Sequence, residues 1–157
     1  MFLDNFHALF LESFDGEIAR FLIYEKPLSR KCFKVVVHAC VSREKKFVSW
    51  LDTAKQDAEA IFLLGDLFDF WFEYKTVVPK GFVRVLGKLA EIKDAGIPIY
   101  FFVGNHDLWM HDYFEKELNI PVYHTPQEFS INNKKFLIGH GDGLGPGDKG
   151  YKRMKKV

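Results

Sequence analysis

Three short apolar runs, each ended by a glycine and followed at once by polar side chains, constrain this sequence most strongly. The three endings are Gly65-Asp66-Leu67-Phe68-Asp69, Gly104-Asn105-His106-Asp107 and Gly139-His140-Gly141-Asp142. An apolar run fixes the backbone within a sheet, and the glycine allows a sharp turn that aims the next side chain across the sheet edge. We therefore expect the three edges to converge on one site.

Between these runs, the hydrophobic pattern alternates between helical and strand-like spacing. Helices are predicted over residues 44–58, 82–92 and 109–118, and strands over residues 61–64, 97–103, 121–123, 129–131 and 134–138. Asn132-Asn133 predicts a hairpin turn. Residues 35–37 offer an opening strand, but the stretch before them has no clean period. Strands separated by helices predict an α/β fold with layered sheets flanked by helices.

Length and charge narrow the class of protein. A chain of 157 residues is expected to form one domain, and its net charge of +1 gives no field that would attract nucleic acid. Cys32 and Cys40 form no metal-binding or secreted disulfide pattern, which favours a reducing cytoplasm. The apolar segment 1–14 contains charged residues, so it fits neither a membrane-spanning helix nor a signal peptide.

The residue types that follow the glycines suit a pair of divalent cations. A carboxylate such as Asp66 can bridge two cations, while an amide oxygen and an imidazole complete one of them without adding negative charge. Two metals about 3.5–4 Å apart can hold a phosphoryl oxygen and activate a shared water. Taken singly, each motif also fits a turn, a helix cap or a structural histidine. Their combination favours phosphate hydrolysis.

In combination, the three motifs resemble the middle of the calcineurin-like metallophosphoesterase signature. The resemblance implies that Asp66 bridges the metals, and that Asn105 and His140 hold the second one. It also implies that His106 stabilises the phosphate or protonates the leaving group, with Asp107 orienting His106, and that Asn105 and His106 contact the substrate. The resemblance runs over residues 42–157, whereas residues 1–41 are atypical, so we expect a single partial domain.

Two longer stretches are similar to the branch that cleaves UDP-2,3-diacylglucosamine to UMP and 2,3-diacylglucosamine 1-phosphate in lipid A biosynthesis. They run over residues 65–74 and 139–151. The resemblance assigns substrate contact to Asp148, for which a solvated turn residue is the alternative. The aromatics Phe68, Phe70, Trp71, Phe72 and Tyr74 are candidates for an acyl-chain entrance, although core packing explains at least half of them equally well.

The sequence departs from this family at both ends. Members begin with a strand that ends in Asp-x-His. The corresponding residues 35–40 contain a histidine, His38, but not this Asp-x-His pair. Members also continue to a Gly-His-x-His motif, which is absent here. We interpret the differences as a frameshift with an early stop, with deliberate shortening or genuine degeneration as alternatives. The missing ligands predict weaker metal binding and turnover in this chain.

The resemblance therefore predicts a hydrolase that uses two divalent ions, Mn²⁺ being expected and Mg²⁺ or another first-row ion being alternatives. The expected partners are a nucleotide-linked acylated sugar and, peripherally, the cytoplasmic face of the inner membrane. The basic stretch 149–156 is a candidate for lipid contact, a solvated helix start being the other reading. Alternative functions are a metallophosphoesterase for soluble nucleotides or phosphodiesters, and an inactive fragment that acts as a binding module. Oligomeric state is not predicted.

Overall fold

The computed structural model describes residues 7–8 and 41–141, and all structural statements refer to these. Their element order is β1 (His7–Ala8), α1 (Val41–Ala54), β2 (Ile61–Leu63), α2 (Val83–Asp94), β3 (Ile99–Phe102), α3 (Tyr113–Leu118), β4 (Val122–Tyr123), β5 (Gln127–Ile131) and β6 (Lys134–Ile138). The predicted opening strand at residues 35–37 and the basic stretch 149–156 lie outside the described residues. The expected α/β class is confirmed.

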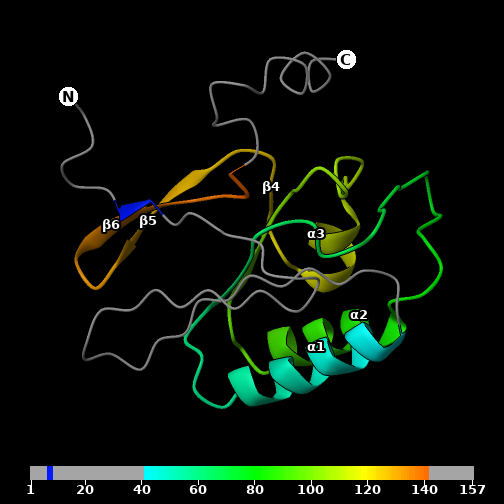
Figure 1. Cartoon of the computed structure of the whole chain (residues 1–157), viewed down its shortest axis with the longest axis horizontal. Helices are drawn as coiled ribbons and strands as arrows, with labels where there is room; N and C mark the ends of the chain where they lie inside the picture. The colour runs from blue at the N-terminus through cyan, green and yellow to red at the C-terminus, as the bar shows by residue number, and fades with distance from the viewer. Residues whose placement is uncertain (1–6, 9–40, 142–157) are drawn as a thin grey trace.

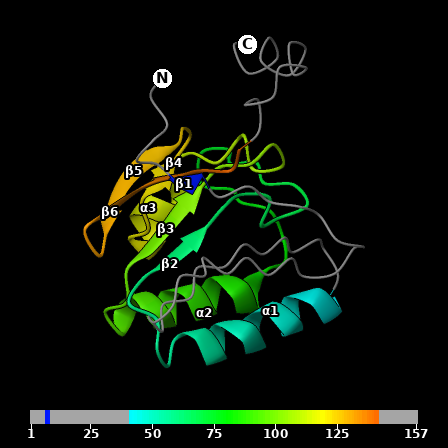
Figure 2. The same cartoon turned by 60° about the vertical axis from the view of Figure 1, so that its left-hand side comes forward.

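The strands form two sheets. In one, β2, β3 and β4 are parallel, with Ile61 opposite Ile99 and Phe101 opposite Val122. In the other, β5 and β6 form an antiparallel hairpin and β1 pairs with β6 in parallel. Helices α1 and α2 lie side by side below the parallel sheet, and the second sheet lies on the other side (Figures 1 and 2).

Alternating side chains of the parallel strands fill two cores. Ile61 and Leu63 of β2, like Ile99 and Phe101 of β3, belong to the core that also contains helix residues such as Leu51. The side chains between them, exemplified by Phe62 and Phe102, belong to a second core with Phe136 and Ile138 of β6. Successive strand residues point to opposite faces, so burial on both faces explains why these strands are apolar throughout.

Several predicted boundaries were wrong by a few residues. Helix α1 ends at Ala54 rather than at residue 58, because Gln56 and Asp57 donate to carbonyls three residues back and form a turn instead. Strand β5 begins at Gln127, two residues earlier than predicted, because Gln127 pairs with Ile138.

The third helix begins at Tyr113 rather than at residue 109. Trp109 instead makes a β-bridge to Phe72, which holds the chain in an extended path before the helix.

The Asn132-Asn133 turn is confirmed. Both residues have positive φ, 53° and 60°, as a type I′ hairpin turn requires. This turn fixes the β5–β6 register that places Ile138, and therefore the end of β6, beside the parallel sheet.

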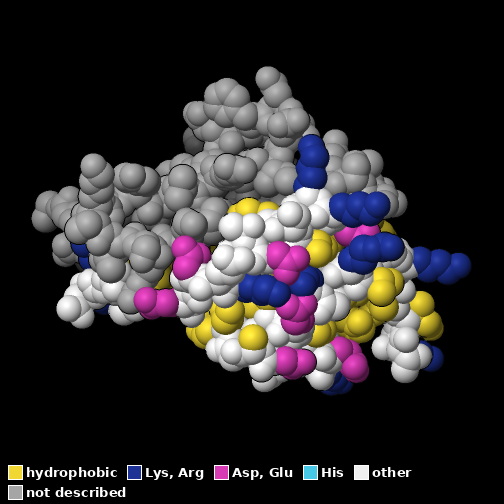
Figure 3. Space-filling model, turned by 90° about the horizontal axis from the view of Figure 1, so that it is seen from below, with side chains coloured by type: hydrophobic (Ala, Val, Ile, Leu, Met, Phe, Trp, Pro, Cys, Tyr) yellow, Lys and Arg dark blue, Asp and Glu magenta, His cyan; other side chains and the backbone are white. Residues whose placement is uncertain are grey.

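Polar contacts join α1 to α2 at two places. Lys55 and Lys88 each form ion pairs with both Asp52 of α1 and Glu91 of α2. Acidic and basic side chains intermingle on the face of the molecule seen from below (Figure 3). Nearer the core, Glu44 Oε1 accepts the backbone N–H of Arg84 at 3.1 Å, in the first turn of α2. Phe82, the residue that precedes α2, provides no side-chain cap, so Glu44 supplies the capping acceptor from the neighbouring helix.

Replacing Glu44 with glutamine should lower the free energy of unfolding by about 1–2 kcal/mol, because a charged acceptor at the helix start is lost from a site that is only 8% exposed. Chemical denaturation monitored by circular dichroism measures the change. Glu117→Gln, on the exposed side of α3, is the control and should stay within about 0.5 kcal/mol of the parent. Equal effects of the two variants would contradict the capping role.

Candidate metal centre

The ends of β2 and β3 approach each other unusually closely. A Cβ atom on Gly65 would lie 2.5 Å from Gly104 N, and one on Gly104 would lie 2.2 Å from Asp66 Oδ1. Both distances are far below van der Waals contact, so glycine is required at each position. Gly65 has φ +81° and Asp66 has φ 53°, a left-handed turn that swings the Asp66 carboxylate over the next strand end.

The third motif reaches the same place from the other sheet. His140 follows β6, and its Nε2 lies 3.3 Å from Asp66 Oδ2. Its Nδ1 lies 2.6 Å from the carbonyl oxygen of Leu64, which can only accept. Nδ1 therefore carries a proton and donates it to this carbonyl, which leaves Nε2 as the ring nitrogen that faces the carboxylate. The structure thus brings Asp66 and His140 together.

The second motif contributes through its backbone. His106 N–H donates to Asp66 Oδ1 at 3.1 Å, so the chain from Gly104 to His106 wraps around this carboxylate. Asn105 lies between these two residues and is exposed. Burial would raise the pKa of Asp66, but the hydrogen bond and charge of His140 and the N–H of His106 outweigh it and lower the pKa below its usual value. Asp66 is thus held ionised, as a metal ligand must be.

His106 and Asp107 have different surroundings. His106 Nδ1 donates to the Asp69 carbonyl oxygen at 2.7 Å, which orients the ring. Asp107 is fully buried, and its carboxylate accepts the N–H groups of Phe68 at 3.3 Å and Gly104 at 3.4 Å. Burial and the nearby Asp66 charge raise the pKa of Asp107 to about 6. Asp107 therefore joins the loop after β2 to the loop after β3, and it orients the segment that carries His106.

The donor atoms suit a cation. Two ligands that each lie about 2.1 Å from one ion are separated by about 3.0–3.4 Å at octahedral to tetrahedral angles, and the Asp66–His140 distance falls in this range. A histidine that binds a metal usually donates the N–H of its other ring nitrogen to a carbonyl or a carboxylate. The Leu64 carbonyl is such an acceptor for His140 Nδ1. Within residues 7–8 and 41–141, no three His, Cys, Asp or Glu side chains are close enough to enclose an ion. The described residues therefore bring together two donor-type side chains, Asp66 and His140.

The remaining sequence-based predictions have mixed outcomes. Asp148, Asp142 and the 35–40 stretch lie outside the described residues. Among the five aromatics, Phe68 and Trp71 are buried in the core, whereas Phe70, Phe72 and Tyr74 are 44–59% exposed. The sequence reasoning also missed Glu73, a buried carboxylate within the aromatic run. Its local sequence carries no signal, because the backbone N–H groups that it binds belong to Asp112 and Tyr113, which are distant in sequence.

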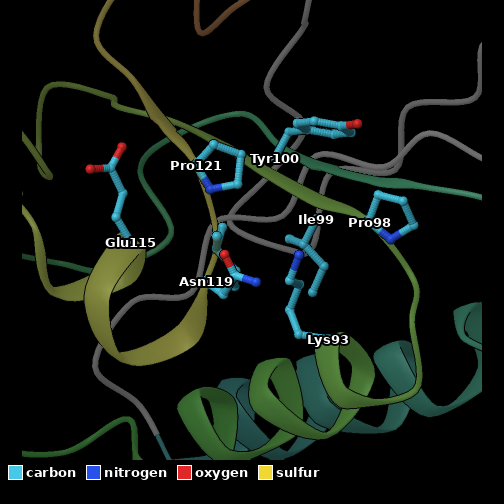
Figure 4. Close-up of a pocket in the computed structure, with 8 residues that line it drawn as sticks. Lys93, Pro98, Ile99, Tyr100, Glu115, Asn119 and Pro121 are labelled. Atoms are coloured by element: carbon cyan, nitrogen blue, oxygen red, sulfur yellow. The ribbon is translucent and has the colours of Figure 1, made fainter.

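A pocket of about 430 Å³ lies at the opposite edge of the parallel sheet. Its walls come from Pro98 and Ile99 at the start of β3, Pro121 before β4, and side chains of α2 and α3 that include Lys93 and Glu115 (Figure 4). The candidate centre lies at the other ends of these strands, so the pocket is separate from it.

The fold and the convergence of the strand ends match a known class. A family model described as calcineurin-like phosphoesterase matches residues 37–153. The chain belongs to this family.

Curated relatives point to one branch of it. A UDP-2,3-diacylglucosamine hydrolase of Porphyromonas gingivalis is 46% identical over 99 residues, which cover 63% of this chain and 38% of that protein. Proteins of the same name from Histophilus somni and Proteus mirabilis are 33% and 34% identical over 70% of this chain, and 47% and 45% of their own lengths are matched. The chain thus spans less than half the length of these relatives.

Replacing Gly104 with alanine should destabilise the fold by about 2 kcal/mol or more, because the added methyl group would overlap Asp66. The same variant should bind Mn²⁺ more weakly in a calorimetric titration. Gly87→Ala is the matched control: it lies within α2 with no atom within 4 Å of the new Cβ, and should stabilise the protein by about 0.5–1 kcal/mol. Similar stability changes in both variants would show that the two strand ends are not in contact.

Proposed function

We propose that this chain is the metal-binding core of a hydrolase that cleaves the pyrophosphate bond of UDP-2,3-diacylglucosamine, releasing UMP and 2,3-diacylglucosamine 1-phosphate. The observation that carries the proposal is the pairing of Asp66 Oδ2 with His140 Nε2, two metal-type donors 3.3 Å apart at a sheet edge where three motifs meet. The names of the relatives supply the substrate class.

Each of the predicted site residues is assigned its own role in this proposal. Asp66 would bridge two divalent ions, with Asn105 and His140 completing the second, while Mn²⁺ is the expected ion and Mg²⁺ an alternative. Bound divalent ions would neutralise phosphoryl charge and make water more acidic. His106, whose Nδ1 proton is held by the Asp69 carbonyl, would in its doubly protonated form donate the Nε2 proton to a phosphoryl or leaving-group oxygen. Asp107 would hold the His106 loop in place, and Asp148 would contact the substrate.

An acylated substrate would bring the protein to a membrane surface. No helix in residues 41–141 is long and apolar enough to cross a bilayer. The location proposed from the acylated substrate in the names of the relatives is the cytoplasmic face of the inner membrane, with peripheral attachment. The exposed aromatics Phe70, Phe72 and Tyr74 would provide apolar surface for the acyl chains beside the charged site.

The decisive assay is release of UMP from UDP-2,3-diacylglucosamine in the presence of Mn²⁺. Asp66→Asn should lower the rate by more than about 100-fold, since it removes the bridging charge rather than a supporting contact. Asp94→Asn, at the exposed end of α2 and remote from the site, is the control and should leave the rate unchanged.

The other outcomes separate the alternative functions. Hydrolysis of bis(p-nitrophenyl) phosphate without preference for the acylated sugar would replace the proposal with a hydrolase of soluble phosphodiesters. A chain that unfolds cooperatively but binds no Mn²⁺ in calorimetry would point to a binding module. Undiminished UMP release by Asp66→Asn would reject the assignment of the centre.

A further inference from the structure

Glu73 is a buried carboxylate outside the predicted centre, and its hydrogen bonds connect two segments of the chain. It is 9% exposed. Its Oε1 accepts the indole N–H of Trp71 at 2.8 Å. Its Oε2 accepts the backbone N–H groups of Asp112 at 2.9 Å and Tyr113 at 3.2 Å, at the start of α3.

The backbone around Glu73 continues the same connection. Trp71 N–H donates to the carbonyl oxygen of His106 at 3.1 Å, and Glu73 N–H donates to that of Trp109 at 3.2 Å. A β-bridge between Phe72 and Trp109 lies between these two bonds. The segment after β2 therefore pairs with the segment after β3, and Glu73 fastens the far end of the pairing to α3.

This pairing holds His106 from two sides. The His106 carbonyl is bound by Trp71, and the His106 ring is bound by the carbonyl of Asp69, two residues before Trp71. The His106 N–H is in turn bound to Asp66. Movement of the 69–73 segment would therefore displace His106 relative to Asp66, because the same short stretch contacts both its ring and its backbone.

We propose that Glu73 is a positioning residue for His106, because its carboxylate fastens the 69–73 segment to the start of α3. The role rests on the proposed function, in which His106 contacts the phosphoryl group. Only a carboxylate satisfies all three donors, since it accepts at both oxygens. A glutamine would turn its NH₂ group toward either the indole N–H or the two backbone N–H groups. The hydrogen bonds to the donors on that side would then be lost.

The simpler role for Glu73 would be to cap α3 alone. Glu44 gives a matched control for that role, because it too is a buried carboxylate, 8% exposed, that accepts a backbone N–H in the first turn of a helix. Its helix is α2, and its hydrogen bonds do not reach the 69–73 segment. Any effect of Glu73→Gln that Glu44→Gln does not reproduce comes from the position of Glu73.

The test compares these two variants in the complete chain by hydrogen exchange of assigned backbone amides and by steady-state hydrolysis with Mn²⁺. In Glu73→Gln, hydrogen exchange at the backbone amides of Trp71, His106 and the substituted position itself should become faster, on the order of 10-fold. The amides of β2 and β3 should stay protected. The kcat should fall by on the order of 10- to 100-fold with little change in KM, because a displaced His106 affects the transition state more than binding. Glu44→Gln should change neither His106 exchange nor kcat.

Each result has one meaning. Faster exchange confined to Asp112 and Tyr113, with kcat equal to that of Glu44→Gln, would overturn the proposal. It would show that Glu73 only caps α3. If the parent chain shows no Mn²⁺-dependent hydrolysis, the proposed function fails, and His106 exchange alone decides whether Glu73 positions that residue. If Glu73→Gln does not fold, Trp71→Phe replaces it: unchanged exchange at His106 would then overturn the proposal.

Discussion

The close contact between Gly65 and Gly104 is the constraint on which the candidate centre depends. Because neither residue has a Cβ, the ends of β2 and β3 lie close enough for the Asp66 carboxylate to accept the N–H of His106. The same turn brings Asp66 to His140, which arrives from the second sheet. A side chain at either glycine would separate these groups. The positions of Asp66 and His140 relative to each other are therefore fixed by backbone geometry.

Much of this arrangement was predictable from sequence, because the apolar runs and glycines carry their own physical signal. A strand buried on both faces has no polar positions, and a glycine at its end marks a sharp turn. The order of β2, α2 and β3 and the convergence of Asp66 with His140 follow from those signals. The metal-ligand roles of Asp66, Asn105 and His140, and the catalytic roles of His106 and Asp107, remain predictions that rest on family resemblance.

Other features could not be predicted, because they depend on contacts between residues distant in sequence. Helix α3 starts late because Trp109 first pairs with Phe72. Glu73 reads as one more polar residue in an aromatic run until the fold places it beside α3. Likewise, the five aromatics share one local pattern, yet Trp71 is buried and Tyr74 is exposed. Periodicity records which residues are apolar, but tertiary contacts decide which of them face solvent.

The central claim is that one cation touches Asp66, Asn105 and His140 at the rim of the parallel sheet. Crystals soaked in Mn²⁺ and measured at the manganese absorption edge test it most directly. The account predicts an anomalous peak about 2.0–2.2 Å from an Asp66 carboxylate oxygen, the Asn105 amide oxygen and His140 Nε2. A peak at another site, or a fully soaked crystal with no peak between these three atoms, would contradict it.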